Sequence, residues 1–288
     1  MKPAPFAYHR PGSVADAVAA LAGDAGAKVL AGGQSLVPLL SMRLAAPSAL
    51  VDINGIPGLD TIEVDTASSG GGVRIGALAR HADVLASEDV RRVQPLVSLA
   101  LANVAHATIR NRGTTVGSLV HADAAAEMPV VLSLLGGSID VEGPGGRRTI
   151  PADELYVGPL ESSVHHDELA VSAFFPALAP GAGVAFEEIA RRHGDYALVG
   201  VAALVDGDTV RAGFLSVSDV PTVVDLTGVA DDDLGDAALE HLEPAGGIHS
   251  DIHATAAYRA QLVRVLTRRV VLAARVSRQA RQPKGVAR

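Results

Sequence analysis

The order of apolar and polar positions predicts a small α/β unit at the start of the chain. From Ser13 to Gly23 the apolar residues recur at helical spacing, with Ser13 placed as an N-cap and Gly23 as a stop. Two apolar runs predict buried strands, at residues 27–32 and 48–54. The segment between them, residues 35–44, predicts a short helix. We expect this unit to span residues 1–54.

A second α/β unit is expected over residues 55–176. It begins with two alternating strands around a Ser/Gly-rich segment, residues 66–72, which is typical of a hairpin turn rather than a phosphate loop. The next segments predict two helical stretches, a helix followed by a hairpin, and a closing strand, at residues 80–90, 93–107, 130–150 and 167–176.

Residues 177–183 are small, contain proline and glycine and have no period, so they predict a domain boundary. Beyond them the pattern predicts three strands and one long helix, at residues 183–192, 196–205, 209–218 and 251–280. We therefore expect a C-terminal α+β domain over residues 181–288, with a three-stranded antiparallel sheet and helices.

Composition and charge narrow the possible functions. The chain of 288 residues has 24 Lys+Arg and 32 Asp+Glu, a net charge of −8, which disfavours nucleic acid as a partner. It has no cysteine, which excludes disulfides, thiolate nucleophiles and iron–sulfur clusters held by this chain alone. The N-terminus has no apolar signal core and no run approaches the ~18–20 apolar residues of a membrane span, so a cytoplasmic location is expected.

The first candidate site is the turn at Gly32 and Gly33. A strand, a Gly-Gly turn and a helix start leave several backbone N–H groups unpaired, and such a place binds anions, phosphate especially. On this motif alone, a simple tight turn is an equal alternative. The dinucleotide fingerprint G-x-G-x-x-G is absent, and Asp52 is interpreted as a strand-end residue rather than a ribose ligand.

A second polar, glycine-containing stretch runs from residue 107 to 129. With the first loop it could close on the two ends of a diphosphate. Its members also have simpler interpretations: a solvated face for Arg110 and Arg112, a core histidine for His121, and the N-cap of a following helix for Asp123.

Metal and hydrolase chemistry are both disfavoured. The runs at residues 121–123 and 165–167 contain histidine and aspartate, but neighbouring residues in an extended stretch point apart and no distant partner is identifiable. There is no G-x-S-x-G elbow, and no residue is a convincing general base or nucleophile. We therefore assign no catalytic residue and no metal ligand.

Four stretches carry a family resemblance, at residues 31–54, 109–132, 147–163 and 190–203. In order and spacing they resemble the FAD-binding medium subunit of molybdenum hydroxylases, such as carbon monoxide dehydrogenase medium chains and the flavin domain of xanthine dehydrogenase. The resemblance implies an α+β, vanillyl-alcohol-oxidase/PCMH-type fold in which two α/β subdomains hold FAD between them, followed by the C-terminal domain.

The resemblance also implies which residues bind FAD. The first loop would hold the diphosphate through main-chain N–H groups, and comprises Ala31, Gly32, Gly33, Gln34, Ser35 and Leu36. The second loop would bind the diphosphate and the ribityl chain from the other side, through Thr114, Gly117, Ser118 and Asp123. The segment that begins at Asp195 would place Tyr196 by the isoalloxazine ring as a stacking lid, and Val171 would belong to the adenine-side wall.

One departure from the family pattern stands out. Family members usually carry Thr-Ile-Gly-Gly where this chain has Thr114, Thr115, Val116 and Gly117. A β-branched residue does not readily adopt positive φ. We expect the backbone at Val116 to lie in the β region with its side chain in the core; the alternative is a narrowed pocket that binds FAD weakly.

In the resembled family, a large molybdopterin-binding subunit oxidises substrate, and a small subunit with two [2Fe–2S] clusters carries the electrons to FAD, which passes them to an acceptor. The resemblance implies both partners, as a dimer of heterotrimers. FAD should be non-covalent, because the chain has no cysteine for a thioether link and no histidine in a recognisable attachment motif. The alternatives are a stand-alone FAD oxidoreductase and a flavin-free scaffold subunit.

Overall fold

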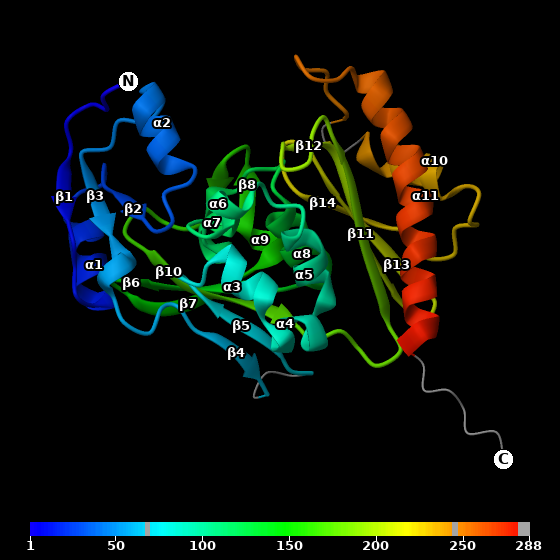
Figure 1. Ribbon diagram of the computed structural model, residues 1–288, viewed down its shortest axis with the longest axis horizontal. Coiled ribbons are helices and arrows are strands. Elements are labelled where there is room, and N and C mark those ends of the chain that lie inside the picture. The colour runs from blue at the N-terminus through cyan, green and yellow to red at the C-terminus, as the bar shows by residue number, and fades with distance from the viewer. Residues whose placement is uncertain (67–69, 244–246, 282–288) are drawn as a thin grey trace.

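The computed structural model describes residues 1–66, 70–243 and 247–281, and arranges them around three main sheets that follow one another along the chain (Figure 1). The first is parallel, in the order β1-β3-β2, with strands Ala7–His9, Ala49–Asp52 and Lys28–Leu30. The central strand β3 is buried, as expected. Strand β2 lies at the edge and is only half-buried, so the prediction of a buried strand there is wrong.

Helices α1 (Val14–Ala22) and α2 (Leu36–Met42) complete this first unit. The Ser13 hydroxyl accepts from the Asp16 N–H, and Gly23 closes α1, so the predicted cap and stop are confirmed. A 3₁₀ turn, η1 (Ile53–Gly55), follows β3 directly.

The second sheet is antiparallel, in the order β4-β5-β10-β6-β7. In that order its strands are Ile62–Asp65, Gly72–Gly76, Leu169–Pro176, Ser138–Gly143 and Gly146–Pro151. The hairpin turn expected at residues 66–72 lies partly outside the described residues, since 67–69 are not described.

Besides β6 and β7, the sequence between β5 and β10 contains helices and a small two-stranded sheet. The helices α3 to α9 are His81–Ala86, Glu88–Val93, Pro95–Leu101, Ala107–Arg110, Thr115–His121, Glu127–Leu135 and Ala152–Leu155. The small sheet pairs β8 (Tyr156–Gly158) with β9 (Glu161–Ser162).

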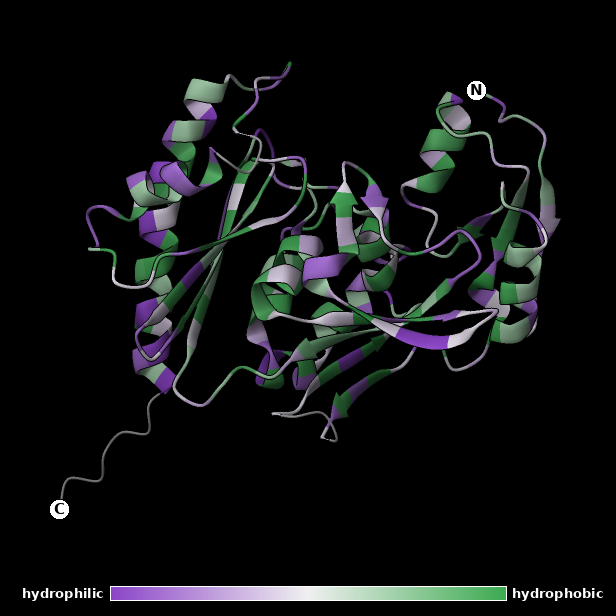
Figure 2. Ribbon diagram, turned by 180° about the vertical axis from the view of Figure 1, so that it is seen from behind, coloured by the Kyte–Doolittle hydropathy of each residue, from purple (hydrophilic) through white to green (hydrophobic). Residues whose placement is uncertain are grey.

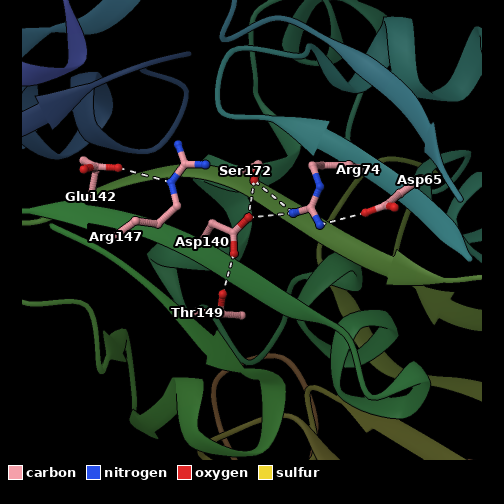
Figure 3. A network of polar contacts seen from close by, with 7 residues as sticks. All are labelled: Asp65, Arg74, Asp140, Glu142, Arg147, Thr149 and Ser172. Carbon is pink, nitrogen blue, oxygen red and sulfur yellow. Dashed lines mark hydrogen bonds and ion pairs between the residues drawn. The ribbon is translucent and has the colours of Figure 1, made fainter. Parts of the chain in front are cut away.

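One polar network touches all five strands of the second sheet (Figure 3). Arg74 on β5 pairs with Asp65 on β4 at 2.8 Å and with Asp140 on β6 at 2.6 Å. Asp140 also accepts from Thr149 on β7 and from Ser172 on β10. Because each strand contributes one member, this network adds side-chain links to the backbone ladder.

The C-terminal sheet is antiparallel in the order β11-β12-β13-β14, with strands Gly183–Ala190, Ala197–Asp206, Thr209–Leu215 and Thr222–Asp225. It has four strands, not the three expected. The fourth is a four-residue edge strand directly after Pro221, too short to show an alternating pattern.

Two helices, α10 (Leu234–Leu242) and α11 (Ala256–Arg281), complete the C-terminal domain. Helix α11 lies along β11 and β12, while α5 and α8 of the second unit also contact this sheet (Figure 1). Helix α11 starts later than the predicted residue 251, because the Asp251 carboxylate accepts from the backbone N–H groups of His253 and Ala254 in a turn.

The apolar core forms two clusters. One joins the first two units and the other lies between the C-terminal sheet and its helices. Hydrophobic and hydrophilic residues intermix along α11 (Figure 2). Among the helices described, none is both long and apolar enough to cross a membrane.

Candidate functional site

The first glycine loop connects β2 to α2 and presents unpaired donors. Gly33 has a φ of +72°, a conformation that glycine adopts at little cost. The side-chain amide of Gln34 folds back and donates to the Gly32 carbonyl at 3.1 Å. In the described part of the chain, the backbone N–H groups of residues 32–35 donate to no other group, as an anion-binding turn requires.

This loop touches the segment that precedes α7. A Cβ atom on Gly32 would lie 2.3 Å from the Arg112 carbonyl oxygen and 2.8 Å from the Gly113 Cα. No side chain larger than hydrogen fits there without a backbone shift. The two polar stretches that the sequence singled out therefore meet in space.

In the second stretch only residues 111–114, between α6 and α7, form a loop, and a helix follows where a longer loop was expected. Thr114 is the N-cap of α7, and its hydroxyl accepts from the Gly117 N–H at 3.2 Å. Gly117 and Ser118 lie in the first turns of that helix. The Ser118 hydroxyl bonds to no group among the described residues, so it remains available to a ligand.

Val116 lies in the same helix with 2% of its surface exposed, and its side chain joins the core. The expected core orientation is confirmed, but the expected β backbone is wrong, because the Thr114 cap starts a helix one residue earlier. The valine thus points away from any ligand at the loops.

A buried histidine supports the start of α7. The His81 backbone N–H donates to the Gly113 carbonyl at 2.9 Å, and its Nδ1 lies 3.2 Å from the Thr115 hydroxyl. Burial, with a smaller contribution from the charge of Arg110, lowers the pKa of His81 to about 4. At neutral pH this side chain is an uncharged hydrogen-bonding group.

A cavity of about 590 Å³ lies at the other end of α7, lined by the segment after that helix, the turn before β12 and the residues after β13. Asp123, Asp195 and Tyr196 all line it, so the structure brings these three predicted residues together. Helix α7 separates the cavity from the glycine loops by seven residues, about 10 Å at ~1.5 Å per residue. The arrangement suits a long ligand with an anionic part and a ring at one end.

Tyr196 stands at the rim of the cavity with 63% of its surface exposed. Desolvation at the cavity rim, together with the neighbouring carboxylate of Asp123, raises the pKa of Tyr196 to about 12. The phenol therefore keeps its proton at neutral pH. This suits a ring-covering residue better than an acid catalyst.

The remaining predicted residues have mixed outcomes. Asp123 accepts from the Ala125 N–H at 2.9 Å in a turn, and α8 starts only after Ala126, so the N-cap interpretation of Asp123 is wrong. Asp195 pairs with Arg192 at 3.3 Å. Val171 is 6% exposed within the core and is not among the residues that line this cavity, so its place in the adenine-side wall stays a prediction.

Two serines that the sequence did not point to also line the cavity. The hydroxyls of Ser216 and Ser218 are buried and have no hydrogen-bond partner among the described residues. Ser216 has a φ of +60°, which is uncommon for a residue with a side chain. Buried polar groups are normally hydrogen-bonded, so these two hydroxyls are available to the polar edge of a ligand.

These features fit FAD. Its diphosphate needs donors, which the free N–H groups of residues 32–35 supply, and its ring needs an apolar slot with polar edges, which the cavity with Tyr196, Ser216 and Ser218 supplies. A metal site finds no such support: the described residues contain no group of three or more metal-ligating side chains.

Comparisons with known proteins also indicate an FAD-binding protein. Residues 4–178 match the family "FAD binding domain in molybdopterin dehydrogenase", and residues 184–274 match "CO dehydrogenase flavoprotein C-terminal domain". The chain is 41% identical over 285 residues to the alpha subunit of the 6-hydroxypseudooxynicotine dehydrogenase complex of Paenarthrobacter nicotinovorans, covering 94% of this chain and 95% of the relative.

Two further matches are similar in extent. The nicotine 6-hydroxylase medium subunit of the same organism is 38% identical over 285 residues, covering 95% of this chain and 99% of the relative. Carbon monoxide dehydrogenase from Hydrogenophaga pseudoflava superposes with a TM-score of 0.87 at 32% identity, covering 98% of this chain and 100% of that one. The chain belongs to the family of FAD-binding medium subunits of molybdenum hydroxylases.

Proposed function

We propose that this chain carries one non-covalent FAD and serves as the exit for electrons in a three-subunit molybdenum hydroxylase. The observation that carries the proposal is the meeting of a free N–H turn at Gly32 with the start of α7, whose other end opens on the cavity with Tyr196. In relatives named as medium subunits or medium chains, this kind of chain is one part of a larger enzyme.

Bound FAD would supply the redox chemistry, accepting electrons from a partner and passing them to an external acceptor. The chain's own residues bind and orient it. The N–H groups of residues 32–35 and the Ser118 hydroxyl would hold the diphosphate side, while Ser216, Ser218 and Tyr196 would position and cover the ring. No cysteine is present in the chain, so iron–sulfur clusters must lie on another subunit.

The proposed domains are residues 1–54 and 55–176 for FAD binding and 181–288 for the medium-subunit domain. The proposed partners are a large molybdopterin-binding subunit and a small [2Fe–2S] subunit, assembled as a dimer of heterotrimers. Because Val116 is buried in the core, the sequence departure at this position gives no support to a flavin-free scaffold.

Four measurements test the proposal. The purified chain, supplied with FAD, should absorb near ~450 nm, and heat should release intact FAD into the filtrate. It should be reduced by dithionite but not by an aldehyde or an aromatic heterocycle, and it should co-purify with one larger and one smaller chain from its native host. Failure to bind FAD would contradict the proposal, and reduction by substrate without partners would favour a stand-alone enzyme.

A further inference from the structure

Two side chains connect the first glycine loop to the segment before α7. The Asn54 amide donates to the Ala31 carbonyl at 2.8 Å, and its oxygen accepts from Arg80 Nη2 at 2.7 Å. Arg80 Nη1 donates to the Arg112 carbonyl, also at 2.7 Å. We call Asn54 and Arg80 the clamp, because together they span from one loop to the other.

The clamp acts where the two loops touch. The Arg112 carbonyl that accepts from Arg80 is the same oxygen that a Cβ on Gly32 would meet at 2.3 Å. The Arg112 carbonyl oxygen thus has the backbone at Gly32 close by and also accepts from the Arg80 guanidinium. If the guanidinium were lost, this carbonyl would lose its side-chain partner, and the contact with Gly32 would lose its support.

Both members of the clamp are themselves held in place. Asp52 accepts from the Asn54 backbone N–H at 3.0 Å and from its side-chain amide at 2.6 Å, which fixes the amide's orientation. Arg80 immediately precedes α3 and forms a β-bridge with Thr114, the N-cap of α7. The clamp therefore reaches both loops from ordered backbone.

The positive charge of Arg80 has no direct carboxylate partner among the described residues, although Asp52, Asp60 and Asp83 act on it from a distance and Arg112 adds a second positive charge nearby. Both of its hydrogen bonds go to uncharged oxygens, and it forms no ion pair with the carboxylates of the described residues. A guanidinium behind the free N–H groups of the first loop favours an anion on the other side of that loop. Arginine also reaches two acceptors in fixed directions, which the point charge of lysine does not reproduce.

We propose that Asn54 and Arg80 are positioning residues that hold the two loops as one cradle for the diphosphate of FAD; this rests on the proposed function. The first loop would bind through its backbone N–H groups and the start of α7 through the Ser118 hydroxyl, so FAD affinity depends on how these donors are aligned before the ligand arrives. Neither residue needs to touch FAD. Removing either side chain should leave all the donor groups present but no longer aligned toward one ligand.

The test is a double-mutant cycle on the full chain freed of FAD. Asn54→Ala and Arg80→Ala should each weaken FAD binding at least about tenfold in a fluorescence titration, ~1.4 kcal/mol. Asn54 and Arg80 belong to one chain of hydrogen bonds, so losing either should break the whole connection. The double variant should therefore bind FAD at most about threefold more weakly than whichever single variant has the lower FAD affinity. Arg80→Lys should keep the salt dependence of FAD binding but recover only part of the affinity.

Matched controls separate positioning from general stability. Arg278 also joins two segments through backbone carbonyls, those of Gly181 and Gly207, and Asn103 donates to the Leu99 carbonyl. Arg278→Ala and Asn103→Ala should leave FAD affinity unchanged. The thermal midpoints of the FAD-free clamp variants should fall no further than those of these controls. The milder Asn54→Ser and Arg80→Lys stand in if an alanine variant does not fold.

The outcomes are distinct. If the wild-type chain does not bind FAD, the proposed function fails and the clamp with it. If the wild type binds FAD but all clamp variants bind within about threefold of it, or the two single effects add in full, the clamp is refuted while the function stands.

Discussion

The Cα of Gly32 lies so close to the carbonyl oxygen of Arg112 that a Cβ atom would come within 2.3 Å of it. This contact joins two segments that are 80 residues apart in sequence. It leaves no room for a methyl group unless one backbone moves.

Gly32→Ala should therefore part the two loops and weaken FAD binding at least about tenfold, ~1.4 kcal/mol. Gly12 is the matched control, since a Cβ there meets nothing within 4 Å and its φ is not positive. Gly12→Ala should bind FAD like the wild type. Equal affinity in both variants would show that the loop contact plays no part in binding.

Gly33→Val should also lower FAD affinity, because valine strains at a φ of +72° and its Cβ would lie 3.1 Å from Leu30 and Val37 side-chain atoms. Gly71 has a similar φ of +70° in a distant turn. Gly71→Val should cost comparable stability but leave FAD affinity intact. Fluorescence titration and thermal unfolding of both variants show whether FAD affinity depends on this loop or only on the general loss of stability from backbone strain.

Val116→Gly should leave FAD affinity within about tenfold of the wild type. It should nevertheless lower the free energy of unfolding by about 3 kcal/mol, since it removes a buried side chain and puts glycine in a helix. The side chain joins the core, not the ligand site. A much tighter FAD complex in the glycine variant, measured by titration, would mean that Val116 obstructs the site.

Arg74→Met should destabilise the second sheet by about 2 kcal/mol in chemical denaturation, because Asp65 and Asp140, whose side chains are 13% and 14% exposed, lose their common cation. Arg147→Met is the control, since Arg147 and Glu142 form a more exposed pair beside the network (Figure 3). It should change stability by less than about 1 kcal/mol. Similar losses in the two variants would count against the network.

Stability should fall as pH rises, because of Glu127. This residue is 6% exposed, and burial together with the charges of Glu188 and Asp123 raises its pKa from the ordinary 4.5 to about 8. Between those values the folded chain holds a proton that the unfolded chain has lost, so the free energy of unfolding decreases with rising pH.

Glu127→Gln should flatten this decline, as measured by urea denaturation across that pH range. Glu188, whose pKa burial raises to about 7, contributes a second slope in the same direction. The exposed Glu240 is the control, and Glu240→Gln should leave the decline unchanged. A decline of equal steepness in the Glu127 variant would exclude Glu127 as its source.

Local signals in the sequence predicted much of the fold. Ser13 and Gly23 bound α1 as expected because a cap and a stop act within a few residues. Strand β14 was missed because a four-residue edge strand has too few positions to show a period. The helix start at Thr114 was missed because it depends on a single hydrogen bond to the Thr114 hydroxyl.

The candidate site divides in a similar way. Residues within one motif, such as Gly32 and Gly33, could be picked out because they stand directly between a predicted strand and a predicted helix start. Asn54 and Arg80 could not, since nothing local distinguishes them and their bond joins residues 26 apart in sequence. Ser216 and Ser218 became visible only once tertiary structure left their hydroxyls buried without partners.

The central position of β10 determines when the second sheet can form during synthesis at the ribosome. Strands β4 and β5 form one hairpin and β6 and β7 another, and β10 pairs with both β5 and β6. Until residue 176 has left the ribosome, the two hairpins have no common strand. The lining of the cavity extends further still, to Ser218 and Arg259, so the nascent chain completes its cofactor pocket only near its end, and cofactor loading becomes a late event in the protein's biogenesis.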